Sequence, residues 1–282
     1  MTTVRDTRGI IAPRSMMRRV RFERLPAPDA LSGLIDWFWA VRWEFDPGVR
    51  HAQQVLSLPA VNISIGDPPP PSEAPPPGPY PLRTVISGVP TRRSTRVLSG
   101  TGWNLAAKTT VGGFGAWLDD VSALTDRALP GAEVHPAWGD DLAVRAERRG
   151  VGEGAALLAS ALLEALSRRP ERRVREAREV AEGARAAEGD RRVRSAADLA
   201  SATGCSVRTL QRLYASHVGV SPTWVIRRFR IIDAAERVQA REPVSWAALA
   251  AELGYSDQAH LTRDFTATLG TTPAAYARAE RA

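Results

Sequence analysis

The chain has 282 residues, of which 44% are hydrophobic and 24% are charged, so it is long enough for two domains with separate cores. Its single cysteine, Cys205, excludes an internal disulfide framework and a zinc site built from several thiolates. No apolar run approaches the roughly 20 residues that span a bilayer, and the N-terminus has no secretory signal, so we expect a cytoplasmic protein without a membrane partner.

The net charge of +7 is unevenly distributed along the chain. Residues 191–282 contain 13 arginines against 8 acidic residues, whereas the first 190 residues are nearly balanced. An excess of positive charge in one part of a chain is typical of a region that docks on a polyanion.

The N-terminal half is predicted to form a mixed α/β, β-barrel-like domain. Residues 1–18 are expected to be flexible, and residues 31–45 predict a short helix that runs into a strand. Apolar runs bounded by glycine and proline predict further short strands within residues 53–65, 83–89, 95–100 and 102–114. Residues 67–81 contain nine prolines in fifteen positions, which predicts a solvated polyproline loop.

A charged segment follows a predicted leucine-rich helix over residues 152–166. Residues 168–194 carry 16 charged side chains in 27 positions, and Val174, Ala177 and Ala181 give only a thin apolar face. We therefore expect residues 168–191 to be a helical linker without a large interface of its own, with a domain boundary near residues 185–192.

Two stretches in the last third of the chain repeat one pattern. They are "DLASATGCSVRTLQRLYASHVGVSP", residues 198–222, and "ALAAELGYSDQAHLTRDFTATLGTTP", residues 248–273. The same features recur in both stretches in the same order. They are a Leu-Ala pair, a glycine, a serine, an arginine between two apolar residues, a second glycine and a hydroxyl residue before proline.

The recurring residues predict the same local structure twice. Gly204 and Gly254 suit a tight turn after one helix, because glycine adopts left-handed backbone at little cost. Ser206 and Ser256 are predicted to be the N-caps of the next helix. The sequence of a helix, a short glycine turn and a second helix occurs twice. This predicts an all-α domain with two helix-turn-helix units.

Helical periodicity separates an inward face from a free face on each second helix. The residues expected to face the core are Leu210, Leu213, Tyr214 and His217 in the first unit and Leu261, Phe265 and Leu269 in the second. The residues expected to be free are Arg208, Gln211, Arg212 and Ala215, then Gln258, Ala259, Thr262, Arg263 and Thr266. Arginine and glutamine on such a face can make bidentate hydrogen bonds to base edges in a major groove.

One helix is predicted to join the two units, from Pro222 to about Gln239. Eighteen residues at about 1.5 Å each extend about 27 Å. Together with the bodies of the units, this length can place two recognition helices about 34 Å apart, which is one turn of DNA.

These motifs resemble the DNA-binding domain of the AraC/XylS family of bacterial transcription regulators. The resemblance covers residues 192–281 and includes "RIIDAA" (230–235), "GYSDQAHLTRDF" (254–265) and "GTTPAAYAR" (270–278). It implies a regulator that binds double-stranded promoter DNA, often as a homodimer, through a domain at residues 192–282. Contact with RNA polymerase is a further expectation.

The resemblance also assigns the residues that read DNA. It implies that Arg208, Gln211 and Arg212 read one groove. Gln258, Thr262 and Arg263 would read the next groove, and Ala259 stands where a larger or polar side chain is common.

Residues 19–167 resemble the uncharacterised N-terminal domain of some actinobacterial AraC-type regulators. The order of "LSGLIDWFWAV", "VLSLPAVNISI" and "VGGFGAWLDDVSALTDRALP" carries this resemblance, which implies a domain that senses a small-molecule effector or pairs subunits. Six tryptophans in this region are either core residues or the wall of an aromatic pocket: Trp37, Trp39, Trp43, Trp103, Trp117 and Trp138.

Two other classes of function stay open beside the regulator: an enzyme with a DNA-binding tail, and an architectural DNA-binding protein without a ligand. The four histidines have no metal-ligand spacing, and "VGGFGAW" lacks the Lys-Ser/Thr of a phosphate loop. Asp119 and Asp120 are adjacent and are expected to be a solvated pair. We therefore predict no catalytic residue, no metal and no cofactor.

Overall fold

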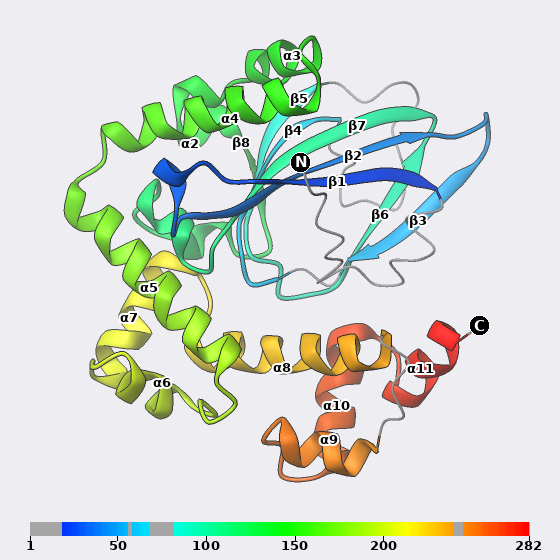
Figure 1. Cartoon of the computed structure of the whole chain (residues 1–282), viewed down its shortest axis with the longest axis vertical. Helices are drawn as coiled ribbons and strands as arrows, with labels where there is room; N and C mark the ends of the chain where they lie inside the picture. The colour runs from blue at the N-terminus through cyan, green and yellow to red at the C-terminus, as the bar shows by residue number, and fades with distance from the viewer. Residues whose placement is uncertain (1–18, 56–57, 68–81, 240–244, 282) are drawn as a thin grey trace.

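The computed structural model describes residues 19–55, 58–67, 82–239 and 245–281, and the predicted flexible N-terminus and most of the polyproline loop lie outside this part. The first 130 residues are rich in strands, as predicted (Figure 1). The strands are β1 (Val20–Pro26), β2 (Ile35–Glu44), β3 (Arg50–Val55), β4 (Asn62–Gly66), β5 (Arg83–Ser87), β6 (Ser94–Ser99), β7 (Thr101–Thr109) and β8 (Ala128–Pro130).

Six strands form one antiparallel sheet in the order β1-β2-β7-β4-β5-β8, while β3 and β6 form a separate antiparallel pair. The 3-10 helices η1 (Asp29–Leu31), η2 (Gly113–Ala116) and η3 (Val121–Leu124) lie between strands, and η4 (Pro136–Trp138) follows the last strand. Three α-helices follow the sheet: α2 (Gly131–Val134), α3 (Asp140–Glu147) and α4 (Gly150–Ser167).

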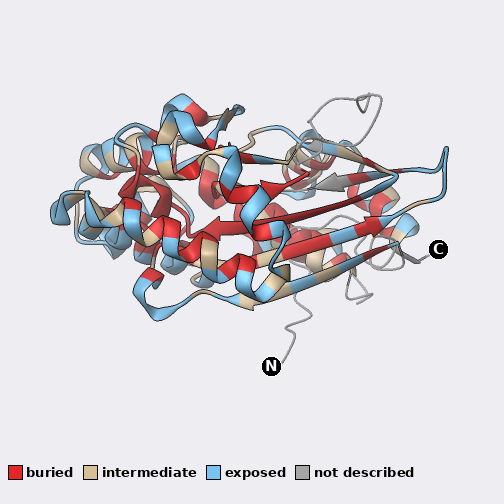
Figure 2. Cartoon of the chain, turned by 90° about the horizontal axis from the view of Figure 1, so that it is seen from above, coloured by how far each residue is buried: buried red, intermediate tan, exposed pale blue. Residues whose placement is uncertain are grey.

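Helices α3 and α4 cover one face of the six-stranded sheet (Figure 1). Ile63 and Leu105 point from the strands into a core that also contains Leu158 and Leu162 of α4. In Figure 2 the buried residues lie mainly along the central strands and the inward faces of the helices. Helix α4 is long and apolar enough to cross a membrane by length and composition, but its buried side packs in this core.

The opposite face of the sheet packs against the β3–β6 pair. Val41 and Trp43 of β2 contact Leu98 of β6 in a smaller apolar cluster. The indole of Trp43 also donates to the carbonyl oxygen of Ser99 at 3.2 Å.

The six tryptophans divide between these two faces in the described residues. Trp103, Trp117 and Trp138 belong to the core under the helices, whereas register places the other three, Trp37, Trp39 and Trp43, on the opposite face of β2. They do not wall a single pocket.

The remaining helices form the C-terminal, all-helical part of the molecule. They are α5 (Glu171–Gly189), α6 (Ala196–Ala202), α7 (Val207–His217), α8 (Pro222–Gln239), α9 (Trp246–Glu252), α10 (Gln258–Leu269) and α11 (Pro273–Arg281). Helix α8 has the predicted bounds and runs beneath the sheet domain between the two helix-turn-helix units (Figure 1).

Each helix-turn-helix unit has its own apolar core. Leu210 and Tyr214 of α7 are buried in the first core, and Leu261 and Phe265 of α10 are buried in the second. The predicted inward faces are therefore confirmed, although Leu213 is only half-buried. Among the described helices, α8 is the one that contributes side chains to both cores.

Helix α5 lies within the predicted linker but has a larger interface than we expected. It contacts η2, α6, α7 and α8, and its Val180, Ala184 and Ala187 belong to the core of the first helix-turn-helix unit. The thin apolar face of this segment had suggested a small interface. Small residues each bury little area, but they let neighbouring backbones approach closely, so such a helix can still pack against several neighbours. The expectation of a linker without a large interface is wrong.

Candidate DNA-binding surface

The first helix-turn-helix unit is formed by α6 and α7. The hydroxyl of Ser195 accepts from the amide of Asp198 to cap α6, and Ser206 accepts from the amide of Thr209 at 3.1 Å to cap α7. Gly204 has φ +67° in the turn between the helices. This left-handed backbone is the reason for a glycine at that position.

The second unit, α9 and α10, differs from the prediction at one cap. Ser256 does not cap α10; the carboxylate of Asp257 accepts from the amide of His260 at 2.7 Å. The extra residue in the second copy moves the helix start by one position, and Ser256 instead donates to Asp257 at 3.2 Å. Gly254 has φ +75°, as the turn requires.

Helix α7 presents the predicted free face to solvent. Arg208, Gln211 and Arg212 are all exposed. No hydrogen bond or ion pair to another part of the described chain engages their side chains. Ala215 is also exposed and extends the same stripe. The stripe therefore offers two guanidinium groups and one amide to a partner.

Helix α10 presents a shorter polar stripe. Gln258, Ala259 and Arg263 are exposed, and Thr262 is half-exposed. The hydroxyl of Thr266 is engaged within the helix, because it donates to the carbonyl oxygen of Thr262 at 2.7 Å. One guanidinium and one amide are thus the strongest hydrogen-bonding groups that α10 offers.

This arrangement has the chemistry that recognition of a DNA duplex requires. Arginine matches the two acceptors of guanine, and glutamine matches the donor and acceptor of adenine in the major groove. The 18 residues of α8 separate the two units, and an α-helix of that length extends about 27 Å.

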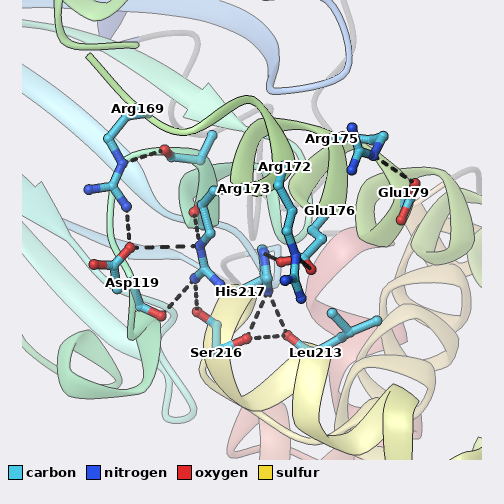
Figure 3. A network of polar contacts seen from close by, with 12 residues as sticks. Asp119, Arg169, Arg172, Arg173, Arg175, Glu176, Glu179, Leu213, Ser216 and His217 are labelled. Carbon is cyan, nitrogen blue, oxygen red and sulfur yellow. Dashed lines mark hydrogen bonds and ion pairs between the residues drawn. The ribbon is translucent and has the colours of Figure 1, made fainter. Parts of the chain in front are cut away.

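Arg173 of α5 anchors the end of α7, a role that sequence patterns did not indicate. Its Nε donates to the carbonyl oxygen of Gly115 at 2.8 Å. Its Nη2 donates to the carbonyl oxygen of Ser216, one residue before the end of α7, at 3.0 Å. The same Nη2 reaches the carbonyl oxygens of Leu118 and Asp119, and Figure 3 shows the network. One arginine therefore joins α5, the sheet domain and the first recognition helix.

His217 fills the space beside this arginine. It is 1% exposed, and a Cβ on Gly115 would come within 2.4 Å of its ring. Burial lowers the pKa of His217 to about 4, and the positive charge of Arg173 acts in the same direction. The histidine is therefore neutral near pH 7, as its predicted place in the core requires.

The part of the chain that the structure describes contains no cluster of three or more residues able to hold a metal ion. Asp119 and Asp120 are both exposed, as expected for a solvated pair. Asp119 forms an ion pair with Arg169, and Asp120 accepts from the amide of Ser122 at 2.9 Å as the cap of η3. Their neighbours give both carboxylates structural contacts.

Comparison with known families matches both halves of the chain. Residues 199–279 match the model of a helix-turn-helix domain, and residues 23–130 match a domain of unknown function, DUF6597. The match to a helix-turn-helix domain supports a DNA-binding transcription regulator. More particularly, the chain carries an AraC-type helix-turn-helix domain behind an N-terminal DUF6597 domain. No curated protein matches the chain.

Solved structures of AraC-type regulators resemble the chain at low sequence identity. A regulator with an AraC-type DNA-binding domain from Chromobacterium violaceum is 21% identical, covers 36% of this chain and 91% of its own, and has a TM-score of 0.34. ToxT from Vibrio cholerae is 13% identical over 86% of this chain and 98% of its own, with a TM-score of 0.43. ToxT bound to an unsaturated fatty acid is 11% identical over 92% and 94%, with a TM-score of 0.41.

Proposed function

We propose that this protein is a cytoplasmic, sequence-specific transcription regulator that reads two successive major grooves of promoter DNA. In this proposal α7 reads one groove with Arg208, Gln211 and Arg212, and α10 reads the next with Gln258, Thr262 and Arg263. The N-terminal domain modulates this binding, through a small-molecule effector or through pairing of two chains. The protein has no catalytic activity of its own.

One observation favours this proposal over the alternatives. The two recognition helices expose arginine and glutamine side chains that have no hydrogen-bonding partner in the described chain, while the opposite faces of the same helices are buried. A purely structural helical bundle has no need of two such polar stripes. Arginine-rich stripes on helix-turn-helix units are suited to phosphate and base contacts.

The experiment uses a duplex that the full-length protein selects from a random-sequence pool. Arg212→Ala is expected to weaken binding to this duplex by about 1–3 kcal/mol, because a bidentate contact to a base is lost, and to weaken binding to unselected DNA much less. Arg145→Ala is the matched control. This exposed arginine of α3 forms an i,i+4 pair with Asp141 at 3.8 Å and lies outside the surface.

Either of two results would contradict the proposal. Equal weakening on both duplexes would make Arg212 a phosphate contact without sequence preference. Failure of the wild-type protein to enrich any sequence would remove sequence specificity altogether and favour an architectural protein.

A further inference from the structure

A loop of the sheet domain contacts the end of the second recognition helix. Arg93, in the β5–β6 connection, directs its Nη1 to the carbonyl oxygen of Leu269, the last residue of α10, at 3.4 Å. Its guanidinium lies directly against Gly270, where an added Cβ would come within 2.4 Å of the Arg93 Cζ. The N-terminal domain therefore reaches the second helix-turn-helix unit.

The same loop holds α8, the helix between the two units. Arg228 donates from Nη2 to the carbonyl oxygen of Thr91 at 2.9 Å. This guanidinium is 5% exposed and lies over the ring of Trp224 at 4.4 Å. Burial lowers the pKa of Arg228 to about 10, against the opposing effect of the Asp126 carboxylate. A buried cation thus fixes α8 to the sheet domain.

The first unit is held by a neighbouring turn. Thr125 donates from its hydroxyl to the carbonyl oxygen of Gly219 at 2.8 Å, in the turn that follows α7. Gly219 has φ +85°, and a Cβ there would lie 2.7 Å from the Thr125 hydroxyl oxygen. The contact leaves no room for a side chain at this position.

Hydrogen bonds between Asp126 and Thr91 join these contact points to one another. Asp126 has φ +58°, which is uncommon for a residue with a side chain. Its carboxylate accepts from the amide of Thr91 at 2.7 Å and from the Thr91 hydroxyl at 2.5 Å. The turn that holds the first unit is therefore bonded to the loop that holds α8 and the second unit.

We propose that this bridge, formed by Thr91, Arg93, Thr125 and Asp126, sets the distance and orientation between α7 and α10. Within the described part of the chain, α8 is the helix that the cores of the two units share, so α8 alone would leave their mutual orientation open to bending and twisting. The bridge adds a second connection between the two units, which runs through the sheet domain. Arg93 and Arg228 are positioning residues, because Arg93 contacts the end of α10 and Arg228 holds α8 to Thr91, and neither belongs to the exposed stripes.

The first test measures the geometry without DNA. Nitroxide labels at Ala215→Cys and Ala259→Cys, both exposed positions, report the distance between α7 and α10 in a Cys205→Ser background. We call the double variant Arg93→Ala/Arg228→Met the bridge variant, because it removes the bonds that join the bridge to α10 and to α8. We expect it to broaden the distance distribution at least about twofold, because methionine fills the buried space at position 228 but cannot bond to Thr91. Arg145→Ala, which removes an exposed arginine of α3 outside the bridge, is the control and is expected to keep the wild-type width.

The second test rests on the proposed function. Single base pairs are inserted between the two halves of the selected duplex, which moves one half-site along and around the helix. We expect the wild-type protein to lose about tenfold in affinity for the first insertion, and the bridge variant to lose less than about threefold. A merely destabilised protein would bind every spacing more weakly without changing the profile.

The outcomes separate the two proposals. Unchanged label distances together with an unchanged spacing profile would overturn the bridge. A wild-type protein that selects no sequence would overturn the proposed function, and the label distances would still decide whether the bridge fixes the two helices. The melting temperature of each variant confirms that a folded protein was measured.

Discussion

The Nη2 of Arg228 lies 2.9 Å from the carbonyl oxygen of Thr91, although 137 positions separate the two residues in sequence. This bond joins the helix between the two DNA-binding units to a loop of the sheet domain. The bonds of Arg173 make a second connection between the sheet domain and the C-terminal helices. If the N-terminal domain modulates DNA binding as proposed, these contacts are the route by which a change there would reach the recognition helices.

Removal of the Arg173 side chain is expected to destabilise the protein strongly. Arg173→Ala leaves carbonyl oxygens of Gly115 and Ser216 without their charged donor, and loss of such bonds costs about 2–4 kcal/mol. Arg172→Ala is the matched control, since this exposed neighbour forms an i,i+4 bond with Glu176 and does not bridge to another element in the described residues. We expect its effect to stay within about 0.5 kcal/mol.

Chemical denaturation of the two variants checks this expectation. Equal unfolding free energies for Arg173→Ala and Arg172→Ala would contradict the role of Arg173 as an anchor between α5, the sheet domain and α7.

Acidification is expected to weaken the fold through His217. Its pKa is about 4 in the folded protein, below the roughly 6.5 of an unfolded histidine. Between these values the unfolded chain binds a proton that the folded chain does not, so the unfolding free energy falls as pH falls from about 6.5 to 4, by up to about 3 kcal/mol. Arg173 and Arg212 oppose protonation in the folded state, and Glu176 favours it.

The measurement is the difference between wild type and His217→Gln in unfolding free energy at pH 7.5 and pH 5. The comparison cancels other titrating groups. We expect the variant to lose less stability on acidification, and a parallel loss in both proteins would contradict the assignment.

The C-terminal domain is expected to need α5 for its stability. A fragment of residues 192–282 lacks Val180, Ala184 and Ala187, which are buried in the core of the first unit. Losing them removes several kcal/mol of apolar burial. A fragment of residues 168–282 keeps them and is expected to melt at a clearly higher temperature. Equal melting temperatures would show that the first unit folds independently of α5.

The tandem units could be predicted from sequence because local rules determine them. Capping residues, turn glycines and helical periodicity fixed the bounds of α8 and the buried faces at Tyr214 and Phe265. Periodicity likewise predicted that Arg212 and Arg263 are exposed. Their contact with DNA stays a prediction.

Other features could not be predicted, for physical reasons that differ between them. Strand β1 was missed because Arg21, Glu23 and Arg24 hide its alternation at the edge of the sheet. The cap of α10 was placed one residue early, since Ser256 and Asp257 are both good caps. Bonds such as that of Arg228 to Thr91 join distant segments, and no local pattern contains them.

The most direct test of two-groove recognition is a map of base preference along the selected site. The map is measured for the wild type, Arg212→Ala, Arg263→Ala and the control Arg145→Ala. Each recognition-helix variant is expected to lose preference in its own short window, and the two windows should lie about 10–10.5 base pairs apart, one turn of DNA. The control should reproduce the wild-type map. Loss of preference at the same bases in both variants, or at none, would contradict reading of two grooves by α7 and α10.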